Sequence, residues 1–268
     1  MKYFCTCDPR HYQILALGFF LALQMVWNDF GPDFTVVFIT LASVCIVQVV
    51  YVYLFQGQSY DLRSPLITGL SLSILLKSSA LWLYPLAALL AICSKYCLRQ
   101  NQYHFFNPAN FGIVLCLLLF PNAVWISPGQ WGDALWLVAA ITGLAALVLS
   151  NARQLDMAAF FLGSYAAMTF VRAVWLGDPP EIPLNQLTGG AILIFSFFMI
   201  TDPKTTPRDY PARALFGIAV AALGFLLQYE FQVREGIFYA LFGLCTVRYL
   251  LARTPKFDKH GLILKRIG

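Results

Sequence analysis

The chain has 268 residues, of which 59% are hydrophobic and 12% are charged, with a formal net charge of +5. An ordinary soluble domain carries about 25% charged residues, so this chain has too few charges to cover a surface that faces water. The composition excludes a disordered chain, a coiled coil and a secreted disulfide scaffold. Because Lys and Arg are spread between apolar runs and form no patch, it also argues against nucleic-acid binding. The predicted solvent of this protein is lipid.

Ten apolar segments follow one another along the chain, separated by Pro, Gly and charged residues. A helix that crosses a bilayer needs about 20 mainly apolar residues, and the third, fifth and eighth segments are too short to cross alone in ordinary helical form. We therefore expect an all-α polytopic membrane protein with about ten transmembrane helices in a single domain. The segments cover approximately 11–28, 34–55, 64–77, 80–98, 107–120, 133–150, 155–176, 186–201, 211–230 and 234–252.

Lys and Arg residues predict the orientation. With ten crossings both termini share one side, and that side receives all but three of the 18 Lys and Arg residues; the exceptions are Lys77, Arg172 and Arg234. Loops on the cytoplasmic side of a membrane carry an excess of Lys and Arg. The distribution therefore predicts cytoplasmic termini, including a C-terminal tail over 253–268.

The ten segments divide into two groups of five, and the third segment of each group opens alike, with Thr68-Gly69 and Thr188-Gly189. Because five is an odd number, the second group must enter the membrane from the opposite face. The pattern predicts an inverted repeat, in which interrupted helices at matching positions indicate a binding site near the membrane midplane. The predicted repeats cover about 11–120 and 133–252.

The fifth segment is preceded by a loop with the sequence YHFFNPANFG. Asn107 is suited to cap the helix, and Pro108 is suited to the first helical position. On one interpretation the loop is only a well-capped helix start. On the other, the free N–H groups of the helix N-terminus and the amides of Asn107 and Asn110 bind the polar edge of a heteroaromatic ligand.

The eighth segment is followed by the sequence FFMITDPKTTP, in which two prolines bracket Lys204, Thr205 and Thr206, and Asp202 precedes the first proline. An acid, a base and hydroxyl groups packed against a membrane helix exceed what a plain connector needs, which favours a binding site. The alternative is a solvated cytoplasmic turn whose lysine follows the positive-inside rule. Both interpretations stay open.

The chain resembles the RnfD/NqrB family in three strings, which are SPLITGLSLSILL, FNPANFGIVL and LTGGAILIFSFFMITDPKTTP. This family comprises membrane subunits of the Rnf and sodium-pumping NADH:quinone oxidoreductase complexes. The chain looks most like its short stand-alone members, of the RnfD-like or UnbU type. The resemblance implies a ten-helix 5+5 inverted repeat like that of urea transporters, in the bacterial inner membrane.

The resemblance also implies a cofactor. Larger members of the family attach FMN covalently to a Thr in a Ser-Gly-Ala-Thr-type motif, which this sequence does not contain, so we do not expect covalent FMN. We expect a flavin (riboflavin or FMN) or a quinone-like ligand held non-covalently between the repeats. The candidate cofactor-binding residues are Thr68, Gly69, Asn107, Asn110, Thr188, Gly189, Asp202, Lys204 and Thr205.

Two functions follow from these observations. The first is a membrane subunit in flavin- or quinone-linked electron transfer that works with other electron-transfer subunits and with membrane lipid. The alternative is a small-solute transporter or channel in which the two Thr-Gly helices aim their N-termini at a polar solute. A membrane scaffold without chemistry is a third. No nucleophile–base pair or paired-carboxylate site is visible, and the seven cysteines lack metal-site spacing, so we expect no metal site and leave enzymatic status open.

Overall fold

The computed structural model describes residues 8–27, 31–55, 61–100, 103–127, 135–152 and 154–253. Within these ranges the chain is mainly helical. The elements are α1 (Pro9–Trp27), α2 (Phe34–Phe55), α3 (Arg63–Leu75), β1 (Leu76–Ser78), α4 (Leu83–Cys97), β2 (Arg99–Gln100), β3 (Tyr103–His104), α5 (Pro108–Leu119), β4 (Val124–Ile126), α6 (Leu135–Ala152), α7 (Leu155–Leu176), α8 (Glu181–Leu187), α9 (Gly190–Ile194), the π-helical turn η1 (Phe195–Met199), α10 (Tyr210–Tyr229) and α11 (Gly236–Arg253). The predicted C-terminal tail lies outside the described residues except for Arg253.

Helices α2 and α7 have the same bounds as the predicted segments. Both runs are long and apolar, and their ends carry clear stop signals. Helix α7 ends at Gly177, whose φ of 74° is the left-handed conformation that glycine adopts without a steric penalty. The backbone N–H of Gly177 there bonds the last turn of the helix and closes it.

Four helices in the described residues are long and apolar enough to cross a membrane, namely α2, α7, α10 and α11. The pair formed by α8 and α9–η1 makes a fifth if it is counted as one bent span. Helices α3 and α5 have only 13 and 12 residues, which agrees with the shortness expected of the third and fifth segments. The all-α membrane class is therefore confirmed, whereas ten crossings stay a prediction.

The predicted eighth segment is a broken helix. Helices α8 and α9–η1 meet at an angle of 50°, and the break falls at Thr188 and Gly189. Gly189 is extended, with φ −61° and ψ 139°, so the helical hydrogen bonds cannot continue through it. The second part then loosens into the π-helical turn η1, a rare geometry that is common at functional sites.

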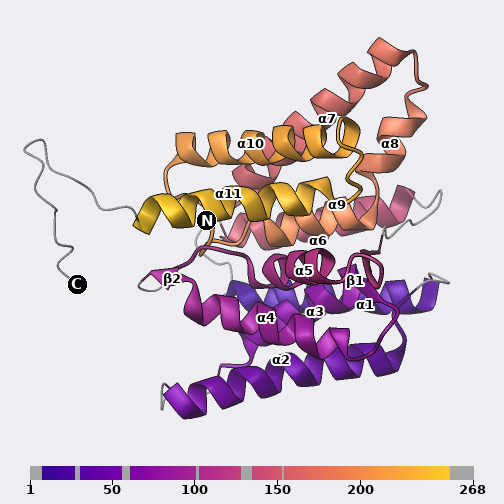
Figure 1. The fold of residues 1–268 in the computed structure, drawn as a ribbon. Coiled ribbons are helices and arrows are strands. Elements are labelled where there is room, and N and C mark those ends of the chain that lie inside the picture. The colour runs from indigo at the N-terminus through magenta and orange to yellow at the C-terminus, as the bar shows by residue number, and fades with distance from the viewer. Residues whose placement is uncertain are drawn as a thin grey trace, which may run out of the picture.

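The same packing scheme occurs in both halves of the chain. In the first half α2 packs on α4 and α4 packs on α5; in the second half α7 packs on α10 and α10 packs on α11. The halves meet where α1 contacts α6 and where α5 contacts α11. Figure 1 shows the first half, in indigo to magenta, below the second half, in orange to yellow.

Short strands lie at the two ends of the helix bundle (Figure 1). At one end β1 pairs with β4 in antiparallel register, with Leu76 opposite Ile126 and Ser78 opposite Val124. At the other end β2 and β3 form a second antiparallel pair, with Arg99 opposite His104. This second pair leads directly into α5 and so positions the loop that precedes it.

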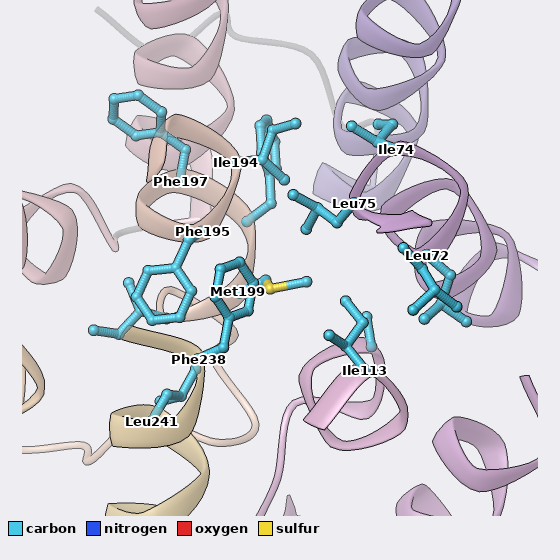
Figure 2. Packing of buried hydrophobic residues seen from close by; sticks show 14 of the residues in the cluster. Leu72, Ile74, Leu75, Ile113, Ile194, Phe195, Phe197, Met199, Phe238 and Leu241 are labelled. Atoms are coloured by element: carbon cyan, nitrogen blue, oxygen red, sulfur yellow. The ribbon is translucent and has the colours of Figure 1, made fainter. Parts of the chain in front are cut away.

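Apolar side chains fill the contact between the two halves. Figure 2 shows Phe195 and Met199 of η1 lying across from Leu75 of α3 and Ile113 of α5. All four side chains are at most 1% exposed. The core is therefore continuous across the two halves of the chain, and it brings the end of η1 close to the start of α5.

Candidate functional site

The start of α5 is capped as predicted. Asn107 is the N-cap residue, its side-chain oxygen accepts a hydrogen bond of 3.1 Å from the backbone N–H of Asn110, and Pro108 occupies the first helical turn. The Asn107 side chain does more than cap, because its amide nitrogen donates a 3.3 Å hydrogen bond to the carbonyl oxygen of Met199. Asn107 thus joins the first half of the chain to the end of η1.

Asn110 forms a second connection between the halves. Its amide nitrogen donates a 3.3 Å hydrogen bond to the carbonyl oxygen of Phe238 in α11. Its side-chain oxygen is buried without a hydrogen-bond partner in the protein. An unpaired buried acceptor costs about 1–3 kcal/mol, so this oxygen is a position at which a bound donor would be favourable.

The segment after η1 is an ordered turn built around Asp202. One carboxylate oxygen accepts a 3.0 Å hydrogen bond from the backbone N–H of Lys204, and the other lies 3.0 Å from Nε2 of His104. The carbonyl of Asp202 accepts 3.0 Å hydrogen bonds from the N–H groups of Thr205 and Thr206. The carbonyl of Thr205 in turn accepts a hydrogen bond from Arg248 of α11. These contacts are more than a solvated connector would need.

Two opposing effects act on the Asp202 carboxyl. Burial raises its pKa, but the contact with His104 and the hydrogen bond from the Lys204 backbone lower the pKa by more. The pKa of this carboxyl therefore lies below its usual value, and Asp202 is a carboxylate at neutral pH.

The two polar motifs meet in one cavity of about 350 Å³, which we call the first cavity. Helix α3 contributes the hydroxyl groups of Thr68 and Ser71 to its wall, and the loop before α5 contributes Asn107. The phenyl rings of Phe197 and Phe198 supply an apolar wall from η1. Its charged or titratable lining residues are Asp8, Arg10, His104, Asp202 and Lys204.

Four of the nine predicted residues line this cavity, namely Thr68, Asn107, Asp202 and Lys204. Gly69 instead packs against α2, where an added Cβ would lie 2.7 Å from Cγ2 of Val44. Thr205 is buried in the Asp202 turn and bonds the Asp202 carbonyl through its hydroxyl group at 3.1 Å.

Thr188 and Gly189 lie elsewhere. The Thr188 hydroxyl bonds the carbonyl of Leu184 within its own helix, and Gly189 lines a separate cavity of about 240 Å³, which we call the second cavity. Tyr165, Gln186 and Gln228 also line the second cavity, and the Tyr165 hydroxyl donates a 2.7 Å hydrogen bond to Gln228. The structure therefore separates the two Thr-Gly segments between two cavities.

Sequence reasoning missed three kinds of lining residue. His104 lies in the recognised loop only three residues before Asn107, but its contact with Asp202 joins positions 98 residues apart. Phe197 and Phe198 were seen only as part of an apolar run. Ser71 lies three residues after Thr68, so one face of α3 carries both hydroxyl groups, and this spacing is the signal that could have found it.

The mouth of the first cavity is closed on one side by four alternating charges at the starts of α1 and α3. The Arg10 guanidinium lies 2.8 Å from the Asp61 carboxylate, and the Arg63 guanidinium lies 2.8 Å from Asp8 and 2.9 Å from Asp61. Hydrogen bonding from Arg63 is the main cause of a lowered pKa at the Asp61 carboxyl. These charges fix the N-terminal ends of the two helices relative to each other.

Replacing Asp61 with Asn is expected to destabilise the protein only slightly, by less than about 1 kcal/mol at pH 7, because solvent screens these part-exposed pairs. The lowered pKa means that the carboxylate stabilises the fold above its ordinary pKa and that this stabilisation disappears as the pH falls through the folded-state pKa. The difference in thermal unfolding between Asp61→Asn and the unmodified protein should therefore shrink on acidification. Asp209→Asn, at an exposed N-cap position that makes no capping hydrogen bond, is the control, and an equal loss in both variants would contradict the assignment.

Comparison with known proteins matches residues 128–246 of the chain to the model of the NQR2, RnfD, RnfE family. The chain is 26% identical over 236 residues to a subunit of the ion-translocating oxidoreductase complex of Pseudomonas paraeruginosa, a match covering 66% of this chain and 69% of that protein. It is 25% identical over 112 residues to the subunits of the same name from Citrobacter koseri and Vibrio vulnificus, covering 42% of this chain and 31% and 30% of theirs. The family match includes the Asp202 turn, and Asn107 lies before it.

Proposed function

Because this chain belongs to the RnfD/NqrB family of membrane proteins, we propose that it is a subunit of an ion-translocating redox complex and that its first cavity holds a flavin or quinone-like ligand non-covalently. Other electron-transfer subunits are its proposed partners, since its relatives carry the name of a complex subunit.

One observation carries this proposal: the two polar motifs of the sequence converge on a single cavity. The Asn107 amide bonds the last carbonyl of η1, and His104 meets Asp202 across the same wall. Neither contact is needed to bury apolar surface. Both hold amide, imidazole and carboxylate groups around one space.

The first cavity suits the proposed ligand class. Its volume of about 350 Å³ lies within the range of small-molecule sites, about 300–1,000 Å³. The rings of Phe197 and Phe198 offer contacts for an aromatic ligand, while Thr68, Ser71 and Asn107 offer donors and acceptors for its polar edge. The sequence has no Ser-Gly-Ala-Thr-type motif, so the proposed attachment is non-covalent.

The proposed topology is a 5+5 inverted repeat of ten crossings in the bacterial inner membrane, with both termini cytoplasmic. Two features support it: the repeated packing of α2–α4–α5 and α7–α10–α11, and the grouping of Arg10, Arg63 and Lys204 at one end of the bundle. A fluorescent protein fused to the C-terminus should fold and fluoresce in a bacterial cell. A dark fusion that is active as a periplasmic reporter would contradict this orientation.

The alternative function, a small-solute transporter or channel, draws support from the second cavity. This cavity is lined by the start of α11 and by Gly189 at the helix break, whereas the first lies at the starts of α3 and α5. Neutral amide and phenol groups suit a small uncharged solute. Flux of such a solute into proteoliposomes by a colourless preparation would favour this alternative.

The experiment that tests the proposed function is purification from membranes in mild detergent, followed by visible spectroscopy before and after denaturation. We expect about one yellow chromophore per chain, retained on gel filtration and released into the filtrate after denaturation. A chromophore that stays with the denatured chain would contradict non-covalent binding. A colourless protein that takes up neither riboflavin, FMN nor a quinone analogue would overturn the proposal.

A further inference from the structure

His104 is held rigidly in the wall of the first cavity. It lies in β3, where its backbone is paired with Arg99 of β2, and its side chain is 8% exposed. The ring cannot turn freely, because Nε2 lies 3.0 Å from the Asp202 carboxylate. The site therefore presents one fixed face of an imidazole to the cavity space.

Asp202 determines which ring nitrogen of His104 carries the proton. A carboxylate accepts a hydrogen bond, so the neutral ring keeps its proton on Nε2 and leaves Nδ1 as the basic nitrogen. The other carboxylate oxygen of Asp202 is fixed by the backbone N–H of Lys204 at 3.0 Å. This arrangement resembles the general rule that a buried carboxylate orients an acid–base histidine.

The other charged groups near His104 have different chemistry. Within the described residues, the cavity is otherwise lined by carboxylates, one guanidinium and one ammonium, namely Asp8, Asp202, Arg10 and Lys204. Histidine is the side-chain type that normally gains and loses charge between about pH 5 and 8. The charged and titratable groups on the elements packed around it are Lys95, Arg99, Cys245, Arg248 and Tyr249.

Resting on the proposed function, we propose that His104 is the acid–base residue that delivers a proton to the ligand of the first cavity when that ligand is reduced, and that Asp202 is its positioning residue. Two electrons come from a reduced flavin or iron–sulfur centre of a partner subunit. The His104 imidazolium loses a proton from Nδ1, which forms one new N–H or O–H bond on the reduced ligand. The neutral imidazole regains its proton from water at the mouth, where Lys204 is exposed.

The test is a redox titration of the riboflavin-loaded protein at a series of pH values, with bound riboflavin measured separately from its absorbance. We expect the midpoint potential of the unmodified protein to show an inflection with pH between about pH 5 and 8. In His104→Gln, whose amide nitrogen can still donate to Asp202, the inflection should disappear while riboflavin stays bound. His11→Gln, at an exposed position in α1, should leave the inflection unchanged.

A second measurement does not depend on redox activity. In the ligand-free protein, nitrogen NMR of labelled histidine should show the neutral His104 ring protonated on Nε2, and Asp202→Asn should weaken that preference. An unchanged inflection in riboflavin-loaded His104→Gln, or a ring protonated on Nδ1, would overturn the assignment of His104 and leave the proposed function intact. An unmodified protein that takes up neither riboflavin nor any other flavin or quinone would overturn both.

Discussion

Asn107→Ala is expected to lose bound flavin and stability together, because the Asn107 side chain makes both a cap and a contact between the halves. The alanine variant removes the 3.1 Å capping bond to Asn110 and the 3.3 Å bond to the Met199 carbonyl. Loss of the cap alone costs about 0.5–2 kcal/mol. Loss of the amide that lines the cavity should weaken ligand binding about tenfold or more, since each 1.4 kcal/mol is a factor of ten.

Asn107→Ser separates the two effects. Serine is also a preferred N-cap residue, so this variant should regain most of the thermal stability, but its short side chain lacks the amide that reaches Met199. We expect its chromophore content after gel filtration to stay close to that of Asn107→Ala. If both variants retained chromophore at the unmodified level, Asn107 would have no role beyond the helix start.

Gly112→Ala is expected to destabilise the protein by about 1–3 kcal/mol, the usual cost of overpacking a well-packed core. A Cβ at this position of α5 would lie 2.6 Å from the backbone carbonyl oxygen of Ala87 and 3.1 Å from the Cβ of Ala91, both in α4. The obstacle at Ala87 is backbone, so the two helices must move apart. That movement would shift the start of α5 and therefore the cavity wall.

Gly163→Ala is the matched control, because an added Cβ at this exposed position of α7 meets nothing within 4 Å. Alanine favours a helix over glycine by up to about 1 kcal/mol, so this variant should unfold at the same temperature as the unmodified protein or a higher one. Thermal unfolding in detergent, followed by gel filtration after heating, measures both. Equal stability of the two variants would show that α4 and α5 do not approach each other this closely.

The positions of the helices could largely be predicted, because hydropathy and punctuation are local properties of the chain. The bounds of α2 and α7 are those expected, and the shortness of α3 and α5 was also visible. The pairing of Leu76–Ser78 with Val124–Ile126 could not be predicted, since it depends on the packing of segments about 50 residues apart. Nor does an apolar run reveal that Phe195–Met199 forms a π-helical turn.

The candidate site was predictable in part for the same reason. Asn107 and Asp202 belong to local motifs with several polar residues each, and the structure brings both motifs to one cavity. The expectation that Thr68 and Thr188 share a site does not follow from the proposed topology. In an inverted repeat, equivalent segments enter from opposite faces, and Thr68 and Gly189 do line different cavities.

The most direct test of the first cavity as the ligand site is an equilibrium titration of chromophore-free protein with riboflavin, followed by quenching of riboflavin fluorescence. Ser71→Leu fills the first cavity, and Ala191→Leu fills the second, since these residues line one cavity each. We expect Ser71→Leu to abolish saturable binding and Ala191→Leu to bind like the unmodified protein. Normal binding by Ser71→Leu together with loss of binding in Ala191→Leu would contradict the account.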